Sequence, residues 1–302
     1  MGWLALAVAC SLAIAVIFKF GEGAGFDRVA LMAVNYIVAF GLAMLLAGGT
    51  LPFGSDALTL LGVSMGALYI TGFIAFALAI RSAGMALAAS TMRLAVAIPV
   101  LAGWLIWAEV PSLVQLVGLL VAGAAFLLIT RPNRSIVTPV TGVVGTGPVA
   151  DERGAEKTGH THVIVVLAFL FVAGGIVDVL KKTFNESFGL VADRAGFLAL
   201  AFGAAFILGV LFIVARGLTG KGWPTWRVVP LGAVLGLVNY GSADFMLRAI
   251  AVLPAPVVFP VNNLAVVMGA ALIGVLGWGE HLSRANVGGL ILAGIALVLL
   301  TI

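Results

Sequence analysis

The chain has 302 residues, of which 63% are hydrophobic and only 9% are charged. Soluble domains carry about 25% charged residues, so this composition excludes an ordinary soluble protein and predicts a membrane protein with several spans. The formal net charge is +4 and the sequence has no basic run, so no nucleic-acid partner is expected. Its single cysteine, Cys10, cannot form an intramolecular disulfide or a thiol metal site.

Ten apolar runs approach the ~20 residues that are needed to cross a bilayer. In chain order they lie at about residues 3–20, 29–47, 58–80, 84–107, 113–130, 163–182, 195–215, 228–250, 254–278 and 285–302. The first run lacks the positive start of a secretory signal, so it is interpreted as a retained helix. Prolines within the fourth and ninth runs, Pro99 and Pro260, predict bends because each removes a backbone hydrogen bond.

Residues 131–162 form the only long polar stretch and are typical of a flexible tether. The predicted organisation is therefore a five-helix repeat at 1–130, this linker, and a second five-helix repeat at 163–302. His160 and His162 have a spacing compatible with a metal pair, but two loop histidines without a third ligand are usually solvated. No metal and no cofactor are predicted.

The two halves repeat each other. Residues 93–96 (RLAV) return as 263–266 (NLAV), a shift of 170 positions. After a one-residue insertion the shift is 171, and the equivalent pairs include Trp107 with Trp278, Glu109 with Glu280, Gly118 with Gly289 and Leu128 with Leu299. This pattern indicates an internal duplication. Because five helices per half is an odd number, the halves must insert in opposite orientations, which predicts an inverted repeat with a substrate site between the halves.

Residues 109–118 (EVPSLVQLVG) and 280–289 (EHLSRANVGG) resemble the paired signature of EamA-type transporters of the drug/metabolite transporter superfamily. Residues 16–19 (VIFK) and 259–263 (FPVNN) are similar to a large bacterial set of that family. The resemblance implies a secondary transporter in the bacterial plasma (inner) membrane. Such a protein moves a small metabolite or drug-like solute by alternating access. The sequence is compatible with a monomer or a homodimer, because no residue requires either state. The resemblance fixes neither the substrate, nor the direction of transport, nor the coupling ion.

Arg93 is the sharpest candidate for substrate binding, because a charge inside a membrane is expensive and normally has a partner or a task. It lies about 9 residues into its run, roughly 13 Å at the helical rise, and its own helix offers no acid. Its partner is expected to be Asp178 or Asp244, an array of carbonyls, or an anionic or amino-acid-like substrate. Asn263 occupies the matching place in the second half with Asn262 beside it, so these residues are expected to face Arg93.

Asp178 and Asp244 are candidates for coupling transport to an ion such as the proton. Each lies four residues before a basic residue, Lys182 and Arg248 respectively, a spacing that favours an intrahelical ion pair. Both interpretations stay open at this stage.

Further binding candidates are polar residues in apolar surroundings. Lys19 ends the first run, where the alternative is a lysine that snorkels to the interface. The other candidates are two Asn-Tyr pairs, Asn35 with Tyr36 and Asn239 with Tyr240. Their side chains can donate and accept hydrogen bonds to a substrate or, alternatively, join one helix to another.

An intramembrane aspartyl protease is the main alternative function, since residues 241–244 (GSAD) are loosely similar to a GxGD motif and Asp178 lies in another run. Such chemistry needs two carboxylates that share a proton. Ala243 in place of glycine and the non-aromatic Val177 argue against it. A lipid flippase is a second alternative. Orientation is open, because eleven basic residues against four favour termini outside, whereas the family resemblance implies cytoplasmic termini.

Overall fold

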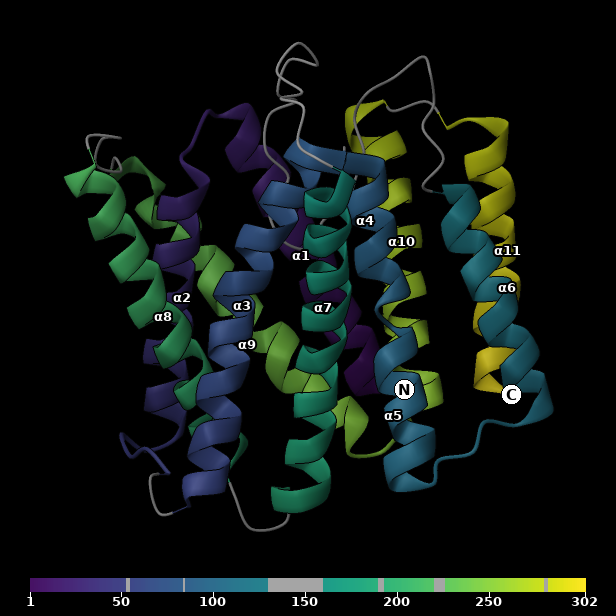
Figure 1. Ribbon diagram of the computed structural model, residues 1–302, viewed down its shortest axis with the longest axis horizontal. Coiled ribbons are helices and arrows are strands. Elements are labelled where there is room, and N and C mark those ends of the chain that lie inside the picture. Colours follow the sequence, from purple (N-terminus) through teal and green to yellow (C-terminus); the bar gives the residue numbers. More distant parts are fainter. Residues whose placement is uncertain (53–54, 84, 130–159, 190–192, 220–225, 280–281) are drawn as a thin grey trace. The chain divides into compact units, whose positions relative to one another are not determined.

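A computed structural model describes residues 1–52, 55–83, 85–129, 160–189, 193–219, 226–279 and 282–302 (Figure 1). The secondary structure of these residues is helical. The elements are α1 (Gly2–Gly23), α2 (Arg28–Leu46), α3 (Asp56–Ala83), α4 (Met85–Leu94), α5 (Ala97–Trp107), α6 (Leu113–Ile129), α7 (His160–Phe188), α8 (Arg194–Leu218), η2 (Trp226–Val228), α9 (Val229–Ile250), α10 (Ala255–Trp278) and α11 (Arg284–Thr301).

Within the described part of the chain, nine spans are long and apolar enough to cross a membrane, and α6 is a shorter apolar helix. One of the nine, Ser90–Trp107, runs over α4 and α5 together. Many large apolar side chains on these helices are exposed, for example Leu105 and Leu113, as expected where lipid replaces water. These properties indicate an integral membrane protein, and each of the ten predicted runs contains a helix.

The fourth predicted run differs from expectation because it is divided into α4 and α5 at Ala95 and Val96. Pro99 explains the division: it has no N–H to give to the carbonyl of Ala95, and its ring would crowd that carbonyl in a continuous helix. The Ala95 oxygen accepts a hydrogen bond from the Ile98 N–H at 3.0 Å instead. By contrast, α10 continues through Pro260.

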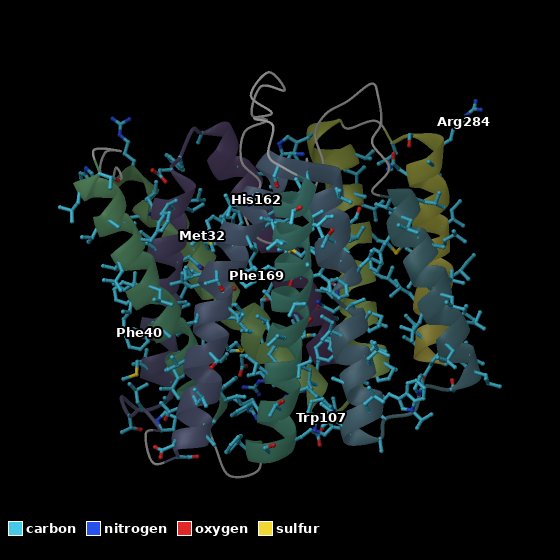
Figure 2. All side chains as sticks on the ribbon, viewed as in Figure 1. Met32, Phe40, Trp107, His162, Phe169 and Arg284 are labelled. Atoms are coloured by element: carbon cyan, nitrogen blue, oxygen red, sulfur yellow. The ribbon has the colours of Figure 1, made fainter. Side chains whose placement is uncertain are left out.

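The predicted linker falls almost entirely on residues 130–159, which lie outside the described residues, as does Glu280. The last residues assigned to the linker, 160–162, belong to the first turn of α7. His162 is exposed there (Figure 2). The side chain of His160, the other member of the histidine pair, is outside the description.

The chain forms two compact units, and each takes residues from both predicted repeats. Of the described residues, unit 1 takes those in 1–73 and 180–251, and unit 2 takes those in 74–129, 160–179 and 252–302. Helices α3 and α7 contribute to both units. The division into compact units is thus a different one from the predicted repeats at 1–130 and 163–302.

Unit 1 is packed through glycines and aromatic rings. A Cβ atom on Gly236 of α9 would lie 2.6 Å from the carbonyl oxygen of Asn35 in α2, so only glycine permits this approach of the two helices. Phe184 of α7 stacks on Phe197 of α8 with 4.1 Å between ring centroids. Phe40 of α2, labelled in Figure 2, lies over Phe206 of α8.

In unit 2, α6 and α11 lie side by side and run in opposite directions (Figure 1). A Cβ on Gly118 would lie 3.1 Å from the Leu299 Cβ, and a Cβ on Gly289 would lie 3.0 Å from the Leu128 Cβ. These two contacts join equivalent residues of the duplicated sequence in reciprocal order. The end of α6 is also tied to the start of α11, since the Asn286 Nδ2 donates to the Ile129 carbonyl at 2.6 Å.

Candidate functional site

Arg93 lies in the last turn of α4 and is only 6% exposed. Its Nη1 donates a hydrogen bond to the Oδ1 of Asn263 in α10, at 3.1 Å, and both residues belong to unit 2. Among the residues that the structure describes, no carboxylate forms an ion pair with Arg93. The expected ion pair with Asp178 or Asp244 is therefore not formed. Arg93 instead bonds to the side-chain amide of Asn263, which the sequence placed opposite it, and its other N–H groups keep donors for another acceptor.

The backbone around Arg93 is shaped by the division between α4 and α5. The Val96 N–H bonds back to the Arg93 carbonyl at 3.3 Å, which closes a tight turn directly after the arginine. Gly175 of α7 packs against this turn, where a Cβ would lie 2.5 Å from the Ile98 side chain and 2.9 Å from the Ala95 oxygen. The proline and the glycine together place Arg93 beside a short interruption in the helix.

Asn262 adds an unsatisfied acceptor next to Asn263. Its Oδ1 is buried and has no hydrogen-bond partner among the described residues. Leaving such an atom unpaired costs about 1–3 kcal/mol. Pro260 also lacks the N–H that would bond to the Pro256 carbonyl one turn earlier. The α10 side of the site thus offers acceptors, whereas Arg93 offers donors.

The two Asn-Tyr pairs come together in unit 1. The Asn239 Nδ2 donates to the Asn35 Oδ1 at 3.1 Å, which joins α9 to α2, and Asn35 is 1% exposed. The rings of Tyr36 and Tyr240 both lie near Phe202, with 6.4 Å between ring centroids in each case. The hydrogen bond between the asparagines matches the alternative in which these residues hold helices together.

Tyr69 of α3 completes this aromatic group and was missed by the sequence reasoning. Its ring stacks on Tyr36 at 6.5 Å and on Phe202 at 5.9 Å. A tyrosine inside an apolar run is the signal that could have identified it. The same signal had already singled out Tyr36 and Tyr240.

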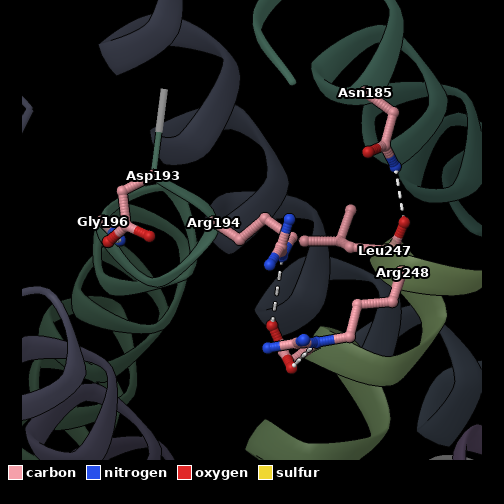
Figure 3. A network of polar contacts seen from close by, with 7 residues as sticks. Asn185, Asp193, Arg194, Gly196, Leu247 and Arg248 are labelled. Atoms are coloured by element: carbon pink, nitrogen blue, oxygen red, sulfur yellow. Dashed lines mark hydrogen bonds and ion pairs between the residues drawn. The ribbon is translucent and has the colours of Figure 1, made fainter. Parts of the chain in front are cut away.

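Asp244 forms ion pairs with two arginines of unit 1, Arg194 and Arg248, both labelled in Figure 3. Its Oδ2 lies 2.6 Å from the Arg248 Nε, which is the intrahelical pair that the spacing predicts. Its Oδ1 lies 3.6 Å from the Nε of Arg194, the first residue of α8. Sequence reasoning missed Arg194, because a basic residue at the edge of an apolar run is ordinarily interfacial.

The remaining candidates lie in α1 and α7. Lys19 of α1 and Asp178 of α7 are both partly buried. Lys182, four residues after Asp178, is 2% exposed and forms an ion pair with Glu186 at 2.7 Å. Glu186 was not among the predicted residues. The residues described include no group of three or more metal-ligating side chains that could hold an ion.

Glu109, from the duplicated Trp-x-Glu motif, has a clear local role. Its Oε2 accepts a hydrogen bond from the Ala255 N–H at 2.7 Å, at the first residue of α10. Pro254, the residue before α10, has no side chain able to do this. Glu109 therefore caps the helix that carries Asn262 and Asn263.

No family model matches the chain. An uncharacterized protein of Haemophilus influenzae is 24% identical to it over 294 residues, which cover 94% of this chain and 91% of that protein. A crystal structure of another protein superimposes with a TM-score of 0.72 and 15% identity, covering 99% of this chain and 95% of that one. This chain has the same fold as that protein. At 15% identity the likeness says nothing more than that.

Proposed function

We propose that the chain is a secondary transporter of the EamA type that moves a small solute across a bacterial inner membrane by alternating access. The hydrogen bond between Arg93 and Asn263 carries the proposal. It joins equivalent positions of the duplicated sequence inside membrane-spanning segments and beside an interrupted helix. Interrupted helices with exposed backbone and polar groups are where transporters of inverted-repeat architecture bind their substrates.

Packing within unit 2 supports the inverted repeat on which this proposal depends. Gly118 contacts Leu299 while Gly289 contacts Leu128, and the helices that carry them are antiparallel. Two copies related by a two-fold axis in the membrane plane would make this pair of reciprocal contacts. Parallel copies would not.

The chemistry of the site favours a solute with an anionic group and a hydrogen-bond donor. The guanidinium of Arg93 suits a carboxylate or phosphate, which it can bind with two parallel hydrogen bonds. The unpaired Oδ1 of Asn262 suits an ammonium or hydroxyl group. An amino acid or a hydroxy acid has both features, so we place amino-acid-like solutes first in the substrate search.

The test begins with thermal unfolding of the detergent-purified protein in the presence of amino acids, organic acids, sugar phosphates and aromatic amines. A solute that binds the folded state raises the unfolding temperature. We expect an anionic solute to do so with the wild type and not with Arg93→Lys, which keeps the charge but loses the planar fork.

Transport itself is then measured as counterflow of that solute in proteoliposomes. Exchange by the wild type, with at least tenfold less by Arg93→Lys, supports the proposal. Binding without any exchange or net flux under a solute or proton gradient would overturn it, because a transporter must release its substrate on both sides. Flux driven by a proton gradient would bring Asp178 and Asp244 forward as coupling residues.

The protease alternative is not favoured by the surroundings of Asp244. Both of its oxygens face arginines, at 2.6 and 3.6 Å, whereas an aspartyl protease needs the carboxylate to share a proton with a second acid.

A further inference from the structure

Arg194 and Arg248 share a single carboxylate in unit 1 but have more donors than it can use. Both arginines approach Asp244 through their Nε atoms, at 3.6 and 2.6 Å respectively (Figure 3). Their Nη groups make no hydrogen bond to any residue in the described part of the chain. Four terminal N–H₂ groups, two on each arginine, are thus left for another acceptor.

Both arginines contact Asp244, and Arg248 has a second contact as well. Arg248 lies over the ring of Trp3, with its Cζ 4.9 Å from the ring centroid, a cation–π contact that adds to the ion pair. The side chains of Arg194 and Arg248 are 37% and 35% exposed, whereas that of Asp244 is 10% exposed. The carboxylate is therefore the buried anchor of the cluster.

Arg194 shows the clearest deficit. Its Nε is buried and has no hydrogen-bond partner among the described residues, because Asp244 is slightly too far away at 3.6 Å. The neighbouring Asp193 is not the missing acceptor. Its Oδ2 accepts a hydrogen bond from the Gly196 N–H at 3.1 Å and so caps the start of α8. An anion drawn in beside Asp244 would satisfy donors that the protein leaves unpaired.

The cluster lies where apolar segments end. Arg194 begins α8, Arg248 is in the last turn of α9, and Trp3 is the second residue of α1. Their contacts place these three helix ends together at one end of unit 1. Such a position is reached both by dissolved anions and by the headgroups of lipids.

We propose that Arg194 and Arg248 form a binding site for an oxyanion, which is the phosphate or carboxylate group of a ligand. Guanidinium groups bind these planar or tetrahedral oxyanions through two parallel hydrogen bonds. Asp244 keeps the two forks together and prevents the arginines from repelling each other. The proposal is independent of the transport function, because it rests on the donors of Arg194 and Arg248, which have no part in the proposed transport site, and its test measures binding alone.

Two kinds of ligand share this chemistry, and the first measurements on the full-length wild type separate them. In one arm, inorganic phosphate replaces chloride at constant ionic strength while thermal unfolding is followed. In the other, native mass spectrometry counts the lipids retained from mixed micelles of phosphatidylglycerol and phosphatidylcholine. Stabilisation by phosphate indicates a soluble ligand, whereas selective retention of phosphatidylglycerol indicates a lipid. If neither arm gives an effect, the proposal is wrong.

Variants then locate the site. We expect Arg194→Gln and Arg248→Gln each to weaken binding in the responding arm roughly tenfold or more, because each loses charge-assisted hydrogen bonds. Arg284→Gln removes the same charge from an exposed position in α11 and is expected to bind like the wild type. Equal binding by all three variants would overturn the assignment.

Arg248→Gln leaves Asp244 with a weaker partner, so the variant could fail to fold. The double variant Asp244→Asn/Arg248→Gln removes both charges of the close pair and leaves the net charge of the cluster unchanged, because Arg194 remains. Arg194→Lys keeps the charge but loses the fork and leaves the close pair intact. If both of these folded variants bind the oxyanion as tightly as the wild type, the arginine forks do not form the site.

Discussion

Arg93 and Asn263 are 170 positions apart, occupy the same place in the two copies of the duplicated sequence, and are joined by a hydrogen bond of 3.1 Å. Equivalent residues of two copies related by a two-fold axis touch only where they lie next to that axis. The copies differ there, because one supplies a guanidinium and the other an amide. The site is thus chemically asymmetric at the place where the proposed repeat would be most symmetric.

Replacing the amide by a carboxylate tests whether Arg93 is reserved for an anion. In Asn263→Asp the new carboxylate lies within hydrogen-bond reach of the guanidinium, so we expect the unfolding temperature to stay at or above that of the wild type. The same carboxylate pairs with the guanidinium of Arg93, so the concentration of anionic solute needed for a given rise in unfolding temperature should increase at least tenfold. Both quantities come from one set of thermal unfolding curves.

Asn263→Leu is the matched control, since it removes the acceptor and leaves a buried donor unpaired. It is expected to lower the free energy of unfolding by about 1–3 kcal/mol. An Asn263→Asp protein that still responds to the anion as the wild type does would show that the solute binds elsewhere.

Gly175 tests the packing around the interruption between α4 and α5. We expect Gly175→Ala to destabilise the protein by about 1–3 kcal/mol, because its Cβ would lie 2.5 Å from Ile98 and 2.9 Å from a backbone oxygen that cannot move aside. Gly174→Ala is the control, since its Cβ would make an ordinary contact at 3.4 Å with Ala95. Equal unfolding temperatures for the two variants would contradict the packing described.

Much of the helical layout could be predicted from the sequence, because the thickness of the bilayer sets the length of the apolar runs that cross it. The interruption at Ala95 and Val96 was foreseen only as a bend. Pro99 predicts the loss of one backbone hydrogen bond. Whether the helix then bends or divides depends on what packs against the bend, here Gly175 of α7, which is far away in the sequence. By contrast, Pro260 is absorbed within a continuous α10.

The candidate site was predictable to the extent that the duplication made it so. Aligning the two copies placed Arg93 opposite Asn263 without any knowledge of the fold. The cluster around Asp244 was only half predictable, since the pair with Arg248 follows from helical spacing whereas the approach of Arg194 requires α8 and α9 to pack together. Likewise the aromatic group needs Tyr69 of α3, which no periodicity connects to Tyr36.

The antiparallel contact of α6 with α11 gives a further stability test. We expect Gly289→Ala to cost about 1–3 kcal/mol, because its Cβ would meet the Ile129 backbone nitrogen at 2.9 Å. Gly118→Ala should cost less, since it meets leucine side chains at 3.1 Å that can shift slightly. Gly288→Ala has open space around its Cβ and should be neutral or stabilising by helix propensity. Thermal unfolding ranks the three variants, and any other order would argue against the reciprocal packing.

Glu109 links the duplicated motif to the site, because its carboxylate caps the helix that carries Asn263. Glu109→Ala removes the acceptor of the Ala255 N–H and the negative charge near the positive end of α10. We expect a loss of about 1–2 kcal/mol and faster hydrogen exchange in the first turn of α10. Glu109→Gln keeps an acceptor on a side chain of the same length, so its loss of stability should be less than half that of Glu109→Ala. Faster exchange throughout the protein, and not chiefly in that turn, would show that Glu109 acts on global stability and that its cap does not govern this end of α10.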